Sequence, residues 1–216
     1  MAKTVFKPAG VPVFPPHADP QGACVLATLL ADEPWRSDVE WPEGFAGGIA
    51  HRLDVKTSGA LLVADDAEET LDIREAFATR RFLKTYRFIA ARDVQWSTHK
   101  CELPIAHDRR RRSRMIVQRG KATPHRGQWH DAETRFKRLG PRLWEATIRT
   151  GVMHQIRVHA AFVGLPLVGD SQYGGGPGTF SLHHMGMFGA GRRTEPVPLP
   201  HWARTQRELR STTTGA

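Results

Sequence analysis

The chain has 216 residues, of which 40% are hydrophobic and 25% charged, as is usual for a soluble globular protein with a sizeable core. Lysine and arginine number 31 against 22 acidic residues, so the net charge is +9, which favours a polyanionic partner such as nucleic acid over a neutral one. The alternative is that the charge serves solubility or an anionic membrane surface. No apolar run approaches the roughly 20 residues that span a bilayer. The two cysteines, Cys24 and Cys101, exclude a disulfide framework, and the N-terminus lacks a signal-peptide core. We therefore expect a cytoplasmic protein with reduced thiols.

The first half of the chain predicts short strands and helices in alternation. In chain order these are an edge strand with a turn over residues 3–14, a short helix over 24–31, a loop over 34–48 and a buried strand over 60–64. A further helix is expected to begin at Asp66, since Asp66 and Glu69 have capping-box spacing. Leu71, Arg74 and Phe77 follow it with helical periodicity.

The second half predicts mostly strands. They are expected over residues 83–91, 114–118, 132–139, 143–150 and 180–184, with a helix over 154–163 that ends at Gly164 and a turn over 174–178. Trp144, Ala146 and Ile148 form the expected core face of one strand. The pattern predicts an α+β fold with a mixed, mostly antiparallel sheet. We expect one catalytic domain over residues 1–210 and a disordered tail over 211–216.

The run His51-Arg52-Leu53-Asp54, followed by Thr57-Ser58-Gly59, is the first candidate for chemistry. It places one carboxylate between an arginine and a turn of small residues in a basic chain. Cationic neighbours keep such a carboxylate ionised, so Asp54 can act as a nucleophile.

A second run lies at Thr150-Gly151-Val152-Met153-His154-Gln155-Ile156-Arg157 and continues through Gly169-Asp170 to Tyr173-Gly174. Together with the first run it resembles the family of RNA pseudouridine synthases with a His-Arg-Leu-Asp signature, the synthase A-like group that modifies ribosomal and transfer RNA. The resemblance implies that Asp54 is the nucleophile and that Arg157 is its ion-pair partner. A cation beside a buried carboxylate keeps it charged, and an arginine also fixes its orientation. The alternative for Arg157 is a purely structural ion pair.

The resemblance assigns further residues to the substrate. Lys84-Thr85-Tyr86 is similar to the strand that bears the active-site tyrosine, which implies that Tyr86 stacks on a flipped uracil. Arg52 is expected to enter the position that the uridine vacates, and Leu53, Lys84 and His154 are expected to contact the substrate. Lys7-Pro8-Ala9-Gly10 and Leu182-His183 resemble shorter motifs of the family. The alternative for a strand tyrosine is plain core packing.

Two departures from the family pattern stand out. Val152 occupies a position where the family usually has an arginine, which puts substrate affinity or choice in doubt. Many members also carry a small RNA-binding domain before the catalytic one. This chain begins almost at the first motif, so we expect the catalytic domain to find its RNA alone or with a partner.

A dense cationic run follows in the middle of the chain, at Arg109, Arg110, Arg111 and Arg112. We expect it to grip RNA phosphates with little base preference, the alternative being a solvated loop. The histidines do not predict a metal site, because His154 and His159 point to different faces of a helix and His183 and His184 to opposite faces of a strand.

The expected function is isomerisation of specific uridines in structured rRNA or tRNA to pseudouridine, without cofactor or metal, by a protein that is expected to be a monomer. Two alternatives stay open. One is a non-catalytic RNA-binding or assembly protein with the same fold. The other is a nucleosidase or glycosidase, which generally needs a second carboxylate, and Asp170 is the only other acid in the motifs.

Overall fold

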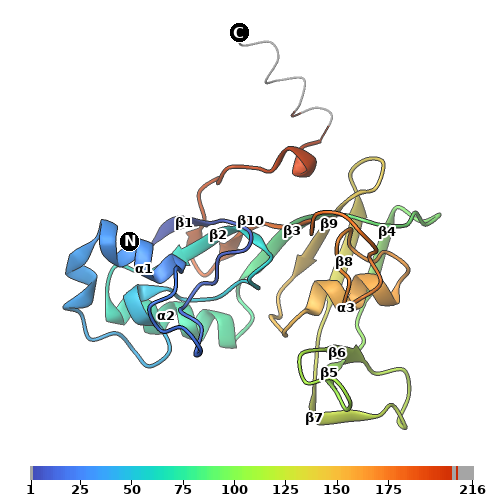
Figure 1. The fold of residues 1–216 in the computed structure, drawn as a ribbon, viewed down its shortest axis with the longest axis horizontal. Helices are drawn as coiled ribbons and strands as arrows, with labels where there is room; N and C mark the ends of the chain where they lie inside the picture. The colour runs from blue at the N-terminus through green and yellow to red at the C-terminus, as the bar shows by residue number, and fades with distance from the viewer. Residues whose placement is uncertain (1, 206–207, 209–216) are drawn as a thin grey trace. The chain divides into compact units, whose positions relative to one another are not determined.

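The computed structural model describes residues 2–205 and Glu208, and the predicted tail at 211–216 lies outside them. Two compact units are present, residues 2–84 with 184–199 and residues 85–183 with 200–205 and 208. The chain leaves the first unit within strand β3 (Leu83–Ile89) and returns to it within β10 (Leu182–Gly189). Helices are few and the sheets are mostly antiparallel, which confirms the α+β fold class (Figure 1). The single domain over 1–210 stays a prediction.

The first unit is built on a sheet in the order β1-β2-β10. Strand β1 (Lys3–Lys7) pairs antiparallel with β2 (Ser58–Val63), and the short β11 (Arg192–Arg193) pairs with β10. All six residues of β2 are buried, because it lies between two other strands. The predicted edge strand and the predicted buried strand are therefore both confirmed.

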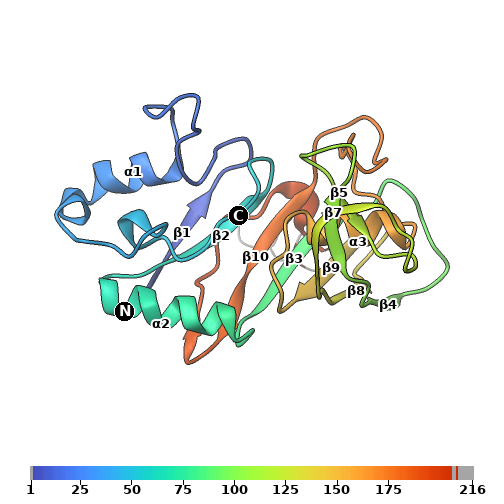
Figure 2. The same cartoon turned by 90° about the horizontal axis from the view of Figure 1, so that it is seen from below.

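Two helices accompany this sheet. Helix α1 (Val25–Asp32) begins after Cys24, whose sulfur accepts the N–H of Ala27. The predicted loop that follows contains two short 3-10 turns, η1 (Pro34–Ser37) and η2 (Ala46–Gly48). Helix α2 (Ala67–Ala78) packs against β2 and β10 (Figure 2).

The start of α2 is confirmed, but its buried face differs from the apolar positions that the sequence emphasised. The carboxylate of Asp66 accepts the N–H of Glu69 at 2.7 Å, as a capping residue does. Leu71 is 51% exposed, whereas Ile73 and Ala76 are fully buried. The aliphatic Ile73 sets the rotation of the helix, because it meets the core of β2 directly.

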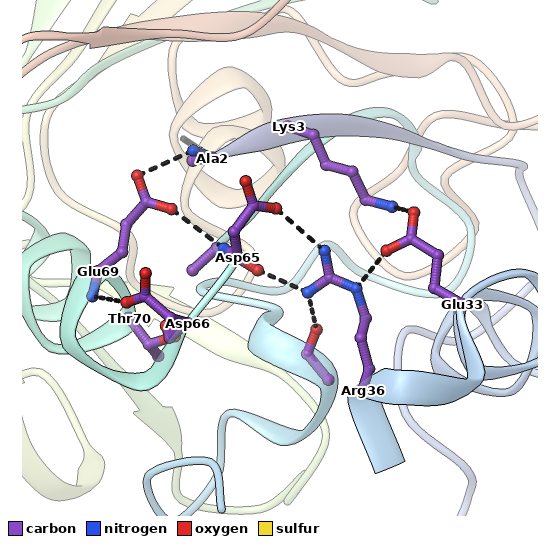
Figure 3. A network of polar contacts seen from close by, with 10 residues as sticks. Ala2, Lys3, Glu33, Arg36, Asp65, Asp66, Glu69 and Thr70 are labelled. Atoms are coloured by element: carbon purple, nitrogen blue, oxygen red, sulfur yellow. Dashed lines mark hydrogen bonds and ion pairs between the residues drawn. The ribbon is translucent and has the colours of Figure 1, made fainter. Parts of the chain in front are cut away.

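A buried arginine joins the segments around β2 (Figure 3). Arg36 as a whole is 1% exposed. It donates to the carbonyls of Gly47 and Ala64 and to the carboxylates of Glu33 and Asp65. A buried guanidinium is stable only when its donors are satisfied in this way, so the network is a structural feature of the first unit.

The second unit contains a sheet in the order β3-β9-β8-β4. Its strands after β3 are β9 (Leu143–Ile148), β8 (Thr134–Arg138) and β4 (Thr98–Cys101). Trp144, Ala146 and Ile148 are buried as predicted, at 0%, 0% and 5% exposure. Strand β4 was not predicted, because its Thr-His-Lys-Cys sequence is mostly exposed and has no apolar alternation.

A smaller sheet in the order β6-β5-β7 completes the second unit. It comprises β5 (Ile105–Asp108), β6 (Met115–Val117) and β7 (His125–His130), and helix α3 (Gln155–Phe162) lies beside β6 (Figure 1). The predicted helix over 154–163 is thus confirmed. A last 3-10 turn, η3, lies at His201–Ala203 near the end of the described chain. Across the described residues, every helix is too short or too polar to cross a bilayer.

Candidate active site and nucleic-acid interface

Asp54 lies in a tight turn immediately before β2. Its backbone carbonyl accepts the N–H of Thr57 at 2.9 Å, which closes the turn. Leu53 is buried at 8% exposure, whereas Arg52 is exposed and Asp54 is half-buried. Leu53 therefore anchors the segment in the core, so that the side chains before and after it are available at the surface.

Lys7 fixes the position of this turn through hydrogen bonds to the backbone. Its side chain is fully buried, and its ammonium donates to three backbone carbonyls, those of Pro8, Val11 and Val55, at 2.9, 2.7 and 3.0 Å. Burial lowers the pKa of Lys7 to about 8, and the negative charge of Asp54 acts in the opposite direction. Lys7 thus ties the segment after β1 to the residue that follows Asp54.

Two further residues of the first motif, His51 and Gly59, have structural roles. Gly59 has a φ of +135°, and a Cβ there would lie 2.2 Å from the carbonyl oxygen of His184, so only glycine permits this approach of β10 to β2. The Nε2 atom of His51 accepts the N–H of Leu62 at 2.9 Å. Burial holds the pKa of His51 well below its usual value, with smaller contributions from His184 and Lys84, so the ring is neutral at neutral pH.

Strand β3 has the alternation that the sequence predicted. Lys84, Tyr86 and Phe88 are buried at 7%, 8% and 0% exposure, while the residues between them are half-buried. The ammonium of Lys84 lies 5.5 Å from the centroid of Phe77, and burial lowers its pKa to about 8. A lysine with that pKa gives up its proton more readily than a surface lysine does.

Arg157 on α3 forms a bidentate ion pair with Asp170. Its Nε and Nη2 atoms donate to the two carboxylate oxygens at 2.7 and 2.9 Å, and Nη2 also donates to the amide oxygen of Gln172 at 3.0 Å. The sequence alone predicts no such role for Asp170. Asp54 belongs to the first unit and Arg157 to the second, so their pairing stays a prediction.

Tyr173 packs against Arg157. Its hydroxyl accepts the N–H of Met115 at 2.8 Å and lies 2.9 Å from Nδ1 of His154. Its ring centroid is 5.0 Å from the guanidinium of Arg157 and 5.4 Å from that of Arg114. Burial raises the pKa of Tyr173 to about 12, so the phenol is neutral. His154 itself caps α3 in the left-handed conformation, with φ +56°.

The predicted arginine run forms the loop between β5 and β6, which we call the arginine loop, residues 109–113. Arg109, Arg110, Arg111 and Arg112 are all exposed. The loop is shaped by Asp108, whose carboxylate accepts the N–H groups of Arg110 and Arg111 at 2.7 and 3.2 Å. Four exposed cations on a short, hydrogen-bonded loop are suited to contact several phosphates.

His159 and His184 have hydrogen-bond partners within the protein. His159 is fully buried, with Nδ1 2.9 Å from the hydroxyl of Thr134 and Nε2 2.9 Å from the carbonyl of Leu103. Nδ1 of His184 contacts the carbonyl of Ala60. In the described part of the chain, no three His, Cys, Asp or Glu side chains are grouped as metal ligands.

Four residues of these sites have contacts that the sequence does not predict: Lys7, Asp170, Gln172 and Tyr173. Lys7, Asp170 and Tyr173 lie within the motifs that resemble the family, and this position is the sequence signal that could have identified them. Their partners could not be read from the sequence, because a buried lysine and a pair 13 positions apart depend on loop geometry.

Comparison with known proteins identifies the family. The model of the RNA pseudouridylate synthase family matches residues 4–162, and the chain belongs to this family. It is 35% identical over 177 residues to "Ribosomal large subunit pseudouridine synthase D" of Yersinia pestis, an alignment that covers 80% of this chain and 50% of the relative. It is 38% identical over 134 residues to "RNA pseudouridine synthase 2, chloroplastic" of Oryza sativa subsp. japonica, with 59% of this chain and 29% of the relative covered.

The fold is also that of a solved relative. The human "RNA Pseudouridylate Synthase Domain Containing 4" has a TM-score of 0.71 at 21% identity, with 94% of this chain and 87% of that chain covered. The chain spans half or less of the length of the two sequence relatives above.

Proposed function

We propose that the chain isomerises specific uridines in structured RNA to pseudouridine, with Asp54 as the nucleophile. The observation that carries this proposal is the half-buried Asp54 on a turn fixed by Leu53 and Lys7, within the residues that match the family. In the reaction the bond between uracil N1 and ribose C1′ breaks, the base rotates, and a bond between C5 and C1′ forms. N1 gains a proton and C5 loses one, so the reaction needs no oxidant, reductant or energy source.

Each remaining candidate has a place in this proposal. Arg157, itself held by Asp170, pairs with Asp54 and orients its carboxylate. Tyr86 stacks on the flipped uracil, and the exposed Arg52 occupies the position that the nucleotide leaves. Asp54 attacks either the ribose C1′ or the uracil ring.

Three further residues and the arginine loop have supporting roles in the proposal. Leu53 fixes the position of Asp54, because its buried side chain anchors the turn in the core. Lys84 and His154 contact the target nucleotide, and the arginine loop binds phosphates on both sides of it.

We further propose that ribosomal RNA is the substrate, with transfer RNA as the second candidate. The name of the Yersinia relative refers to the large ribosomal subunit. We place the protein in the cytoplasm as a monomer that binds RNA through its positive surface. Its two buried free cysteines are consistent with a reducing compartment.

The direct test uses purified protein and a ribosomal RNA transcript with tritium at C5 of its uridines. Wild-type protein is expected to release tritium to water, because C5 loses its hydrogen, and to leave pseudouridine in the RNA. Asp54→Asn is expected to bind the transcript with unchanged affinity and to release none. Tritium release by Asp54→Asn at the wild-type rate would contradict the role of Asp54.

Free uracil in place of pseudouridine would instead indicate a glycosidase. Tight binding of the transcript by wild-type protein with neither product would favour the non-catalytic RNA-binding alternative.

A further inference from the structure

We propose that a pocket beneath the arginine loop binds an unpaired nucleotide of the substrate RNA, other than the uridine that reacts. This inference rests on the proposed function for the identity of the RNA. The pocket lies within the second unit, between β5, β6 and α3, and has a volume of about 870 Å³. Apolar side chains, among them Val117, Val158 and Phe162, form one part of its wall, and Arg109, Arg114 and Arg119 form another.

Phe162 supplies the surface on which a base can stack. It is the last residue of α3 and is 42% exposed, whereas Val117 and Val158 in the same pocket are 4% and 6% exposed. The guanidinium of Arg119 lies 5.7 Å from the centroid of its ring. An exposed aromatic ring beside an arginine is the arrangement on which unpaired bases stack, and the stacked base removes apolar surface from water.

The arginines supply the binding site for phosphate. Asp108 is the acidic residue among those that line the pocket, and its carboxylate already accepts two backbone N–H groups of the arginine loop. The lining therefore has an excess of positive charge. An uncharged ligand would not neutralise this charge, whereas a phosphate would. A ligand with a flat aromatic ring and a phosphate satisfies both parts of the wall.

An RNA chain fits this surface better than a free mononucleotide does. Arg111 and Arg112 are exposed on the same loop, beyond the residues that line the pocket. In an RNA chain, the phosphates on either side of the bound nucleotide would contact these cations. A mononucleotide has no such neighbouring phosphates.

The pocket is connected to Arg157 through two residues. Tyr173 lines the pocket and has the guanidinium of Arg114 5.4 Å and that of Arg157 5.0 Å from its ring centroid. Gln172 donates to the carbonyl of Ser113 at 2.9 Å and accepts from Arg157 at 3.0 Å. The nucleotide in the pocket therefore lies near the candidate catalytic arginine, and Gln172 joins the arginine loop to that arginine.

The test compares two labelled RNAs by fluorescence anisotropy, a hairpin with a six-nucleotide loop and a blunt duplex without unpaired bases. Phe162→Ala is expected to weaken hairpin binding about tenfold, since stacking on an aromatic ring contributes on this scale. Binding of the duplex is expected to change less than about twofold, because phosphate contacts persist. Phe162→Tyr keeps the ring and is expected to bind the hairpin as wild type does.

Phe188→Ala is the matched control, because Phe188 is 55% exposed but lies in the first unit. It is expected to change neither affinity. Equal effects of Phe162→Ala on hairpin and duplex, or no effect on either, would overturn the proposal. Binding needs no turnover, so the same comparison in an Asp54→Asn background decides about the pocket even if the protein forms no pseudouridine.

Discussion

At the scale of single residues, the candidate nucleophile depends on side chains that do no chemistry. Asp54 lies on a turn whose position is set by Lys7. The buried ammonium of Lys7 donates to three backbone carbonyls, which take the place of the water molecules around an exposed ammonium. Removing this ammonium takes one donor from each of the three carbonyls. The carbonyl of Val55 still accepts the N–H of Gly10, but a polar group that loses its partner inside a folded chain is costly.

Lys7→Met is therefore expected to lower the free energy of unfolding by about 3 kcal/mol. Urea unfolding followed by tryptophan fluorescence measures this change. Lys3→Met removes a lysine from the same strand whose ion pair with Glu33 is partly exposed, and is expected to cost less than about 1 kcal/mol. If the two variants are equally stable, Lys7 does not hold the turn.

The sequence predicted the candidate residues better than their contacts. Asp54, Tyr86 and Arg157 stood out by motif, and the buried face of Lys84 and Tyr86 followed from alternation. The ion pair of Arg157 with Asp170 could not be predicted, because it depends on the path of the loop between them, and the sequence does not define that path. Lys7 was also missed as a buried residue, since a lysine at a strand end normally faces water.

At the scale of elements, the first unit depends on the close approach of β10 to β2 at Gly59. A Cβ at this position would lie 2.2 Å from the carbonyl oxygen of His184 and 2.6 Å from its nitrogen. Both atoms belong to the backbone, so neither can move without separating the strands.

Gly59→Ala is expected to destabilise the protein by more than about 3 kcal/mol, through this collision and the strain of φ +135°. The loss is measured as a lower midpoint in thermal unfolding. Gly120→Ala is the control, because nothing lies within 4 Å of its Cβ and its φ is not positive, and it is expected to change stability by less than about 0.5 kcal/mol. Similar midpoints for both variants would show that the strands can separate at low cost.

Elements with a strong apolar pattern could be predicted and polar ones could not. Strand β9 was predicted with its core face, because Trp144, Ala146 and Ile148 alternate with polar residues. Strand β7 was missed because its sequence, His-Arg-Gly-Gln-Trp-His, has no apolar alternation and pairs only at one edge of the small sheet. The face of α2 was misjudged at Leu71, since apolar residues occupy more than one side of that helix.

At the scale of the whole molecule, buried histidines make stability depend on pH. Burial, together with the charge of Arg87, lowers the pKa of His183 to about 4, and burial also holds the pKa of His51 well below its usual value. Between pH 6.5 and 4 the unfolded chain binds protons at these histidines that the folded chain does not.

Stability is therefore expected to be fully present above pH 6.5 and to fall as the pH decreases toward 4, with His183 contributing on the order of 3 kcal/mol. Urea unfolding at a series of pH values measures the slope. His183→Asn is expected to reduce it, whatever its effect on stability at pH 7. His17→Asn, an exposed position, is expected to leave it unchanged, and an unaltered slope in His183→Asn would contradict the buried-histidine explanation.

The net charge of +9 and the exposed arginine loop belong to the same scale, because both direct the molecule to a polyanion. The central claim, that this polyanion is an RNA whose uridines Asp54 isomerises, is tested most directly by pseudouridine mapping of total RNA from cells with and without the gene. One or a few uridines are expected to lose the modification on deletion, and to regain it with the wild-type gene but not with Asp54→Asn. An unchanged pseudouridine map after deletion, or full rescue by Asp54→Asn, would contradict the account.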